Sequence, residues 1–380
     1  MARVLVESYM VRYPLGGMLS WTLQYLVGLH RLGHDVVLVE RADHAYACYD
    51  PRLGTTGADC SHGVKVVADL LERFGLGGRW CFVDHAGRHY GGSEQKVAEL
   101  FATADVFMAM TLEECWVDRA AEVPCRVLVD GDPAFRQVAM AQAAQSGAEL
   151  PHYDFYFTTG RNIGSPASEV PTAGLRWRPM FHPVDCSLFR PTRPAEGMMT
   201  TVMNWRSYDE VRFGGVSYGQ KDVAFERFLD LPRRVSGGLE VAVAGTGIPL
   251  ERLRDHGWRV RGAGEVTASF DAFCDYIHGS LGEFSVCKDG YTVSRSGWFS
   301  DRSAAYLASG RPVVLEDTGF SGHLPCGEGL FAVAGVDEAA EAIERVRKDP
   351  ERHARAARAL AVEHLDAERV LGRMLHEMGV

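Results

Sequence analysis

The chain lacks the long apolar runs and the paired cysteines that would place it in several large classes of protein. No apolar stretch approaches the roughly 20 residues that a membrane-spanning helix needs. The opening MARVLVESYMVRY has no long apolar segment followed by a small-residue cleavage site. We therefore expect no membrane partner, no secretory signal and a cytoplasmic location. The nine cysteines are scattered and none forms a C-x-x-C pair, which argues against a zinc site or a redox dithiol.

Basic residues are also in the minority. The chain has 40 Lys and Arg residues against 50 Asp and Glu residues, which gives a net charge of -10. Nucleic acids and anionic membranes are bound through basic faces. This balance therefore predicts no nucleic-acid partner and favours a small-molecule or glycan partner.

The 380 residues are too many for one ordinary core and suit two domains. In the first half, RVLVES at 3–8, a helix-length run at 18–32 and DVVLVE at 35–40 form a βαβ unit, and further apolar strand-like segments follow. Three prolines between residues 183 and 194 interrupt this pattern, which restarts with TTVMNW at 200–205. Apolar strands without polar alternation are typical of sheets that are covered on both faces.

The predicted fold is therefore α/β, with two doubly wound, parallel-sheet (Rossmann-like) domains that face each other across a cleft. We place the first domain at 1–185, a linker at 186–199 and the second domain at 200–360. A C-terminal helix at 361–380 is expected to pack back on the first domain.

The stretch RSGWFSDRSAAYLASGRPVV, residues 295–314, reads as a loop, a helix and the start of a strand. Ser300 is a suitable N-cap, and Asp301 in the first turn suits the positive end of a helix. Arg295, Ser296 and Gly297 precede it and offer a cation, a hydroxyl and room for close backbone approach. A helix start at the carboxyl edge of a parallel sheet can bind an anion; a capped helix with an incidental Arg explains the same residues.

A pair of acidic residues ends an apolar strand of the first half. CRVLVDGDPAF places Asp130 and Asp132 where the strand would open onto the cleft. A carboxylate at that point could orient a hydroxyl group or act as a general base. An Asx turn before Pro133 is the structural alternative.

Several segments, in this order, resemble the GT-B glycosyltransferases, especially the large group of retaining enzymes often called family 4. The segments are GGMLSWTLQYLVGLHRLGHDVVLV (16–39), HPVDCSLFRP (182–191), NWRSYDEVRFGGVSYGQKD (204–222), VAVAGTGIPLERL (241–253) and ASGRPVV (308–314). The resemblance implies a hexosyltransferase that moves a sugar from a nucleotide-diphosphate sugar, such as a UDP- or TDP-sugar, to a hydroxyl or amine of a soluble acceptor. It also implies that the second domain binds the donor and the first the acceptor, with retention of configuration.

The resemblance assigns roles to individual residues. The diphosphate would be held without a metal, and no other cofactor is expected, because a helix start with Arg and Lys can stabilise its charge. Asp130 and Asp132 remain the candidate catalytic residues on the acceptor side. The donor-binding candidates are Arg206, Lys221, Gly245, Thr246, Arg295, Ser296, Gly297, Ser300, Asp301 and Arg302, and the acceptor-side candidates are Gly16 and Gly17. Arg302 could equally face solvent.

The sequence departs from that family in two ways. Two Glu residues eight apart normally flank the helix of the quoted stretch, but Gly297 and Ala305 stand at these positions. Either Asp301 or Asp289 replaces the Glu that binds the ribose, or another group holds the ribose. The segment 207–220 also separates Arg206 from Lys221 by more than the family spacing and could close over the donor. The chain therefore resembles a divergent branch.

Other functions stay open on the sequence alone. Asp130-Gly131-Asp132 looks like the metal-binding signature of GT-A glycosyltransferases, in which both carboxylates serve a divalent cation. A nucleotide-sugar binding protein without turnover and a nucleotide-sugar 2-epimerase are further alternatives.

Overall fold

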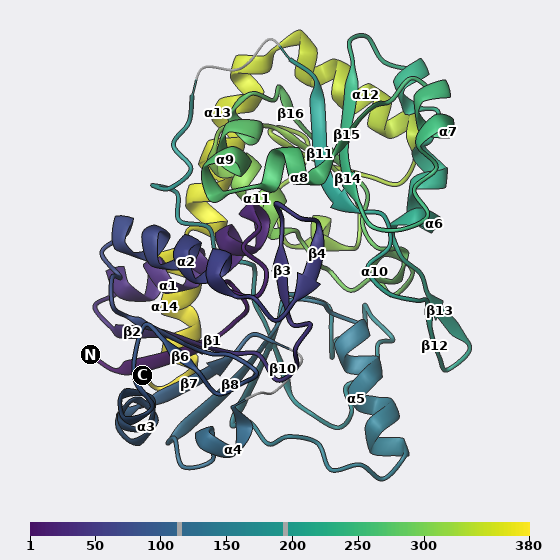
Figure 1. The fold of residues 1–380 in the computed structure, drawn as a ribbon. Coiled ribbons are helices and arrows are strands. Elements are labelled where there is room, and N and C mark those ends of the chain that lie inside the picture. Colours follow the sequence, from purple (N-terminus) through teal and green to yellow (C-terminus); the bar gives the residue numbers. More distant parts are fainter. Residues whose placement is uncertain (112–115, 193–196) are drawn as a thin grey trace.

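The computed structural model describes residues 1–111, 116–192 and 197–380. Within these residues the strands form two main sheets, one in each half of the chain (Figure 1). The first sheet has the order β10-β9-β8-β7-β1-β2-β5-β6, and its strands are parallel apart from the β5–β6 pair. Its strands are β1 (Arg3–Glu7), β2 (Asp35–Arg41), β5 (Trp80–Val83), β6 (His89–Tyr90), β7 (Val106–Ala109), β8 (Cys125–Asp130), β9 (Phe155–Thr158) and β10 (Trp177–Pro179).

The second sheet is parallel throughout and has the order β15-β14-β11-β16-β17-β18. Its strands are β11 (Met199–Asn204), β14 (Leu239–Ala244), β15 (Arg259–Gly262), β16 (Gly282–Ser285), β17 (Val313–Glu316) and β18 (Leu330–Val333). Two small hairpins lie outside the sheets: β3 (Cys48–Asp50) with β4 (Thr55–Gly57), and β12 (Val211–Phe213) with β13 (Val216–Tyr218).

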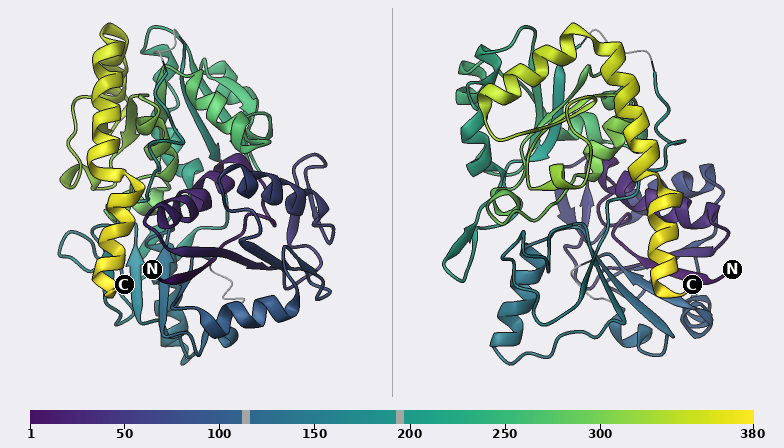
Figure 2. Two further views of the ribbon diagram at one scale, coloured as in Figure 1. Left: turned by 90° about the vertical axis from the view of Figure 1, so that its left-hand side faces the viewer. Right: turned by 180° about the vertical axis from the view of Figure 1, so that it is seen from behind.

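Helices cover both faces of each sheet (Figures 1 and 2). This is why the central strands are continuously apolar: Val4, Leu5 and Val6 of β1 are wholly buried. The helices of the first half are α1 (Gly16–Arg31), α2 (Ser61–Arg73), α3 (Glu94–Thr103), α4 (Val117–Ala120) and α5 (Phe135–Gln145). The prediction of an α/β protein with Rossmann-like, parallel-sheet domains is confirmed.

The helices of the second half include short ones that lie at the ends of strands. They are α6 (Lys221–Phe225), α7 (Leu250–Asp255), α8 (Ala263–Thr267), α9 (Phe270–His278), α10 (Asp289–Val293), α11 (Asp301–Ala308), α12 (Val336–Lys348), α13 (Pro350–Leu360) and α14 (Ala367–Met378). No helix in the described ranges is long and apolar enough to cross a membrane.

The last helix connects the two halves of the molecule. Figure 2 shows the chain running from α13 beside the second sheet to α14 beside the first. α14 packs so closely on α1 that a Cβ at Gly28 would lie 2.6 Å from Leu371 and 2.9 Å from Ala367. The Val184 amide donates to the Leu365 carbonyl at 2.9 Å, and the Ala367 amide donates to the Val184 carbonyl at 3.0 Å. These contacts fix the relative position of the two sheets.

Each sheet has a point at which the strand order reverses direction. In the first sheet it lies between β1 and β7, and in the second between β11 and β16. Ligands of open α/β sheets bind outside the carboxyl ends of strands at such points. The strand order alone therefore indicates where each half would hold a ligand.

Candidate functional site

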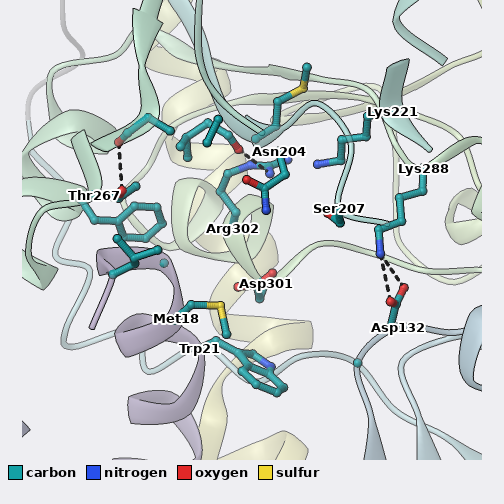
Figure 3. Close-up of a pocket in the computed structure, with 18 of the residues that line it drawn as sticks. Met18, Trp21, Asp132, Asn204, Ser207, Lys221, Thr267, Lys288, Asp301 and Arg302 are labelled. Atoms are coloured by element: carbon teal, nitrogen blue, oxygen red, sulfur yellow. Dashed lines mark hydrogen bonds and ion pairs between the residues drawn. The ribbon is translucent and has the colours of Figure 1, made fainter. Parts of the chain in front are cut away.

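A cavity of about 470 Å³ lies between the two halves and is lined from both reversal points. Tyr9 follows β1 and Met110 follows β7, while Asn204 ends β11 and Lys288 comes shortly after β16. Figure 3 shows side chains from both halves directed into this space. The cavity is therefore built from the segments at which two Rossmann-like halves would each present a ligand.

One part of the cavity wall in the second half is nearly free of charge. Ala244 ends β14, and Ala263, Gly264 and Thr267 belong to α8. Small side chains here leave backbone groups accessible, which suits the flat base and the ribose of a nucleoside.

Lys221 is the first residue of α6 and lies half-buried on the cavity wall. Its ammonium is directed into the cavity beside Asn204 (Figure 3) and has no hydrogen bond or ion pair to any residue of the described ranges. Desolvation, with a smaller effect from the nearby positive charge of Arg302, lowers the pKa of Lys221 to about 7. An uncompensated cation in a desolvated cavity favours an anionic ligand.

Arg302 also reaches the cavity, but its charge is already neutralised. It is buried in α11, and its guanidinium forms an ion pair with Glu283 and donates to Ser285 at 2.7 Å and to the Val202 carbonyl at 2.8 Å. The structure therefore excludes the solvent-facing alternative for this residue. Its main contacts tie α11 to strands β11 and β16.

Asp132 lies on the cavity wall and connects the two halves. Lys288 donates to both of its carboxylate oxygens at 2.9 Å, and Tyr208 donates to it at 2.5 Å. Tyr291 is a further donor, and the Lys288 ammonium also lies 4.9 Å from the centre of the Phe135 ring. Burial alone would raise the pKa of Asp132, but Lys288 and the two hydroxyls hold it below its usual value. This carboxylate is ionised and surrounded by donors.

Asp130, in contrast, does not reach the cavity. It is wholly buried, and its carboxylate accepts from Gln137 at 2.8 Å, from Thr158 at 2.7 Å and from the Asp132 amide at 2.9 Å, with the Arg136 Nε 3.6 Å away. Burial raises its pKa. Asp130 therefore stabilises the turn before Pro133, as in the Asx-turn alternative. This position does not favour the predicted catalytic role.

A third group of polar side chains lines the part of the cavity next to the first half. Asp301, the first residue of α11, lies above Trp21 and Met18 of α1 in Figure 3. His182 also lines the cavity, although it is only 3% exposed. Neither the His182 Nδ1 nor the Trp21 Nε1 has a hydrogen-bond partner in the described part of the chain.

The two glycines predicted on the acceptor side take different positions at the start of α1. Gly17 lines the cavity, and a Cβ there would meet nothing within 4 Å. Gly16 instead faces the second half, where a Cβ would lie 2.4 Å from the Ser269 carbonyl and 2.6 Å from Phe273. Only Gly17 is placed to let a ligand approach the helix start.

The loop before α11 lies against the first half and not on the cavity wall. The Asn162 side chain donates to the Arg295 carbonyl at 2.9 Å, and the Asn162 amide donates to the Ser296 carbonyl at 3.0 Å. A Cβ at Gly297 would lie 2.9 Å from the Asn162 nitrogen. The loop serves as a contact between the halves, and this placement does not favour the predicted donor-binding roles of Arg295, Ser296 and Gly297. Ser300 is buried beside them, outside the cavity wall.

The remaining donor-binding candidates lie at the rim. Arg206 is half-exposed, and its Nε donates to Asp222 at 3.0 Å. Gly245 and Thr246 are exposed and follow Ala244 at the end of β14. Asp289, the other suggested ribose ligand, is paired with Arg227 at 2.8 Å and lies away from the cavity wall.

Sequence reasoning missed several residues of the cavity wall. Lys288, Tyr208 and Tyr291 meet Asp132 only because the two halves face each other. A signal existed for Lys288, which stands three residues after the end of the buried strand β16. The sequence did not indicate which of the scattered cations would lie beside the reversal point.

Two facing Rossmann-like halves with a cavity between their reversal points define the GT-B fold of glycosyltransferases. Solved structures agree along the whole chain. An α-glucosyltransferase in complex with UDP and a 13-mer DNA containing a central A:G mismatch has a TM-score of 0.60 and 10% identity, with 100% of both chains covered. TarM has a TM-score of 0.56 and 9% identity, covering 99% of this chain and 98% of its own.

A further similar structure is AviGT4, a glycosyltransferase involved in avilamycin A biosynthesis. Its TM-score is 0.52 at 12% identity, with 99% of this chain and 97% of AviGT4 covered. No protein-family model matches the chain, and no curated protein sequence matches it. The predicted GT-B fold is thus confirmed by structure, while membership of the family 4 group stays a resemblance.

The same comparison corrects one expectation. The acidic balance of the chain predicted no nucleic-acid partner, but α-glucosyltransferases of this fold were solved with both UDP and DNA. The exclusion was wrong because net charge describes the whole surface, whereas binding depends on the local potential of one face.

Proposed function

We propose that the protein is a glycosyltransferase that moves a sugar from a nucleotide-diphosphate sugar to a hydroxyl or amine of an acceptor. The observation that carries the proposal is the position of Lys221. Of the basic side chains on the described cavity wall, it is the one that no carboxylate neutralises, and it lies at the reversal point of the second sheet. The UDP in structures of this fold supports the choice of a nucleotide-bound anion.

The donor would lie along the cavity with its nucleoside in the second half. Ala244, Ala263 and Gly264 form the uncharged wall for base and ribose, and Lys221 is then placed for the diphosphate. The start of the 16-residue helix α1 faces the same space at Gly17, where unpaired backbone N–H groups and the positive helix end favour an anion.

The reaction breaks the bond between the anomeric carbon and the terminal phosphate oxygen, and the electron pair leaves with the diphosphate. A new bond forms between the anomeric carbon and the acceptor oxygen or nitrogen, whose proton passes to the departing diphosphate. Lys221 and the amides of the α1 start would stabilise the charge that develops on that oxygen. We propose that this occurs without a metal ion. The support is that the Asp130 carboxylate is buried and engaged, so Asp130 and Asp132 do not present a joint site. Sustained turnover in EDTA is the expected result.

The test pairs ligand binding with turnover. Calorimetry with UDP-, TDP- and GDP-sugars identifies the donor, and release of nucleoside diphosphate reports the reaction. Lys221→Met should lower turnover by roughly 10²–10³-fold, the usual effect of removing one group that stabilises transition-state charge. Lys65→Met is the matched control, because Lys65 lies exposed on α2 and pairs with Asp69.

The outcomes separate the alternatives. Unchanged turnover in Lys221→Met would contradict the assignment of the anion site. Donor binding without release, across acceptors, would instead indicate a binding protein. The acceptor panel includes a DNA duplex beside small molecules and glycans, since DNA is present in structures of this fold. Retention of the anomeric configuration is what the family 4 resemblance implies, and the configuration of the product tests it.

A further inference from the structure

We propose that the part of the cavity bounded by Trp21, His182 and Asp301 holds the transferred sugar and selects a neutral hexosyl group over a hexuronosyl group. This inference rests on the proposed function, because it concerns the sugar of the same donor. It names the class of sugar that the cavity accepts.

The three side chains come from separate elements that meet only in the folded protein. Trp21 lies on α1, Asp301 begins α11, and His182 lies in the segment that follows β10. All three line the cavity, and Figure 3 shows Asp301 above Trp21, apart from Lys221. A donor with its diphosphate at Lys221 would therefore extend its sugar toward Asp301 and Trp21.

The buried nitrogens of this group lack partners in the described protein. His182 is 3% exposed and Trp21 is 8% exposed, and the His182 Nδ1 and the Trp21 Nε1 have no hydrogen bond from the described residues. Buried polar atoms are normally satisfied, so unsatisfied ones on a cavity wall point to a ligand with hydrogen-bonding groups. The hydroxyls of a sugar both donate and accept and can serve these atoms.

Asp301 decides the charge of that ligand. No basic side chain of the described ranges forms an ion pair with it, and the hydrogen bond that its carboxylate accepts within those ranges comes from the Ser300 hydroxyl at 3.5 Å. Its carboxylate can accept from sugar hydroxyls but would repel a second carboxylate. His182 does not offset this charge, because burial lowers its pKa and the ring is neutral near pH 7.

The aromatic side of the group completes the match to a sugar. The Tyr9 and Trp21 rings lie 5.8 Å apart at 41°, and Met18 lies beside Trp21 in Figure 3. A pyranose presents C–H groups on its faces and hydroxyls around its rim. An aromatic surface with the His182 imidazole near it, together with the Asp301 carboxylate, suits such a ring.

The experiment measures binding by calorimetry to the full chain. The nucleoside diphosphate that binds most tightly among UDP, TDP and GDP is first identified. Its neutral hexose form and its hexuronate form are then compared in the wild type, in Asp301→Asn and in His182→Leu. Asp69→Asn is the control, because Asp69 is exposed on α2.

The wild type should bind the neutral form at least about tenfold more tightly than the hexuronate form, the effect expected of one repelling charge. Asp301→Asn should reduce this difference in affinity to below about threefold. His182→Leu should lower the affinity for the nucleotide sugar. Neither substitution should change the affinity for the nucleoside diphosphate alone. Equal binding of both sugars by the wild type, or an unchanged preference in Asp301→Asn, would overturn the inference alone. Failure to bind any nucleoside diphosphate would overturn the proposed function with it.

Discussion

Binding of a diphosphate to Lys221 should take up a proton. In the empty cavity, desolvation holds the pKa of Lys221 at about 7, so the side chain is about half neutral at pH 7 and about nine-tenths neutral at pH 8. One anionic charge about 4 Å away is worth about 4 kcal/mol in a partly buried site, equivalent to about three pKa units. The bound complex should therefore keep Lys221 charged at both pH values.

The expected uptake is the neutral fraction that becomes charged, about 0.5 proton per site at pH 7 and about 0.9 at pH 8. Calorimetry of UDP or the preferred nucleoside diphosphate in buffers of different ionisation enthalpy measures it directly. The experiment at pH 8 reports on Lys221 more directly. A terminal phosphate titrates near pH 6 and is fully ionised at pH 8, so the ligand itself exchanges no proton. Affinity should fall as the pH rises above 7, since the protein must then be protonated to bind.

Two variants isolate the contribution of this residue. Lys221→Arg keeps a charge at every pH in the range and should bind without proton uptake, and Lys221→Met should lose both uptake and most of the affinity. Equal uptake in the wild type and in Lys221→Met would refute the reasoning, because another group would then be the one that titrates. Absence of uptake at pH 8 in the wild type would refute it as well.

Four further variants have outcomes that the contacts determine. Gly17→Leu should reduce the affinity for the diphosphate by more than about tenfold without loss of stability, because its side chain enters open cavity space. Gly16→Ala should lower the free energy of unfolding in urea by about 1–3 kcal/mol, because its Cβ would overlap the Ser269 carbonyl before α9. Asp132→Asn should lower the free energy of unfolding by about 2 kcal/mol, measured in urea, because Lys288 loses its charged partner. Arg206→Ala should leave turnover within about threefold of the wild type, because Arg206 lies at the rim; a hundredfold loss would restore it to the anion site.

The fold could be predicted because its signal is local. Apolar strands such as RVLVE and CRVLVD stand between helix-length segments, and a parallel sheet covered on both faces requires that pattern. Lys221 was a candidate only through the resemblance of 204–222 to the GT-B segment that holds the donor diphosphate, and it lies at the start of a helix between the strands β11 and β14.

The site as a whole could not be predicted, because its residues are selected by contacts between the halves. Asp132 and Lys288 are 156 residues apart in sequence, and nothing near either residue indicates the other. The loop at 295–297 shows the opposite case. Its composition suits an anion site, but Asn162, 133 residues before Arg295, docks on its carbonyl groups and places it between the halves.

The charges of the cavity wall explain why total charge was a poor guide to the ligand. Three of the four basic side chains that line it have their own carboxylate: Lys288 with Asp132, Arg302 with Glu283, and Arg136 with Asp130. Among the described wall residues this leaves one cation, Lys221, and one anion, Asp301, without an ion-pair partner. A ligand that matches both is negative at one end and neutral, with many hydroxyls, at the other. A nucleotide sugar has that distribution of charge, and a net charge of -10 on the chain neither favours nor excludes it.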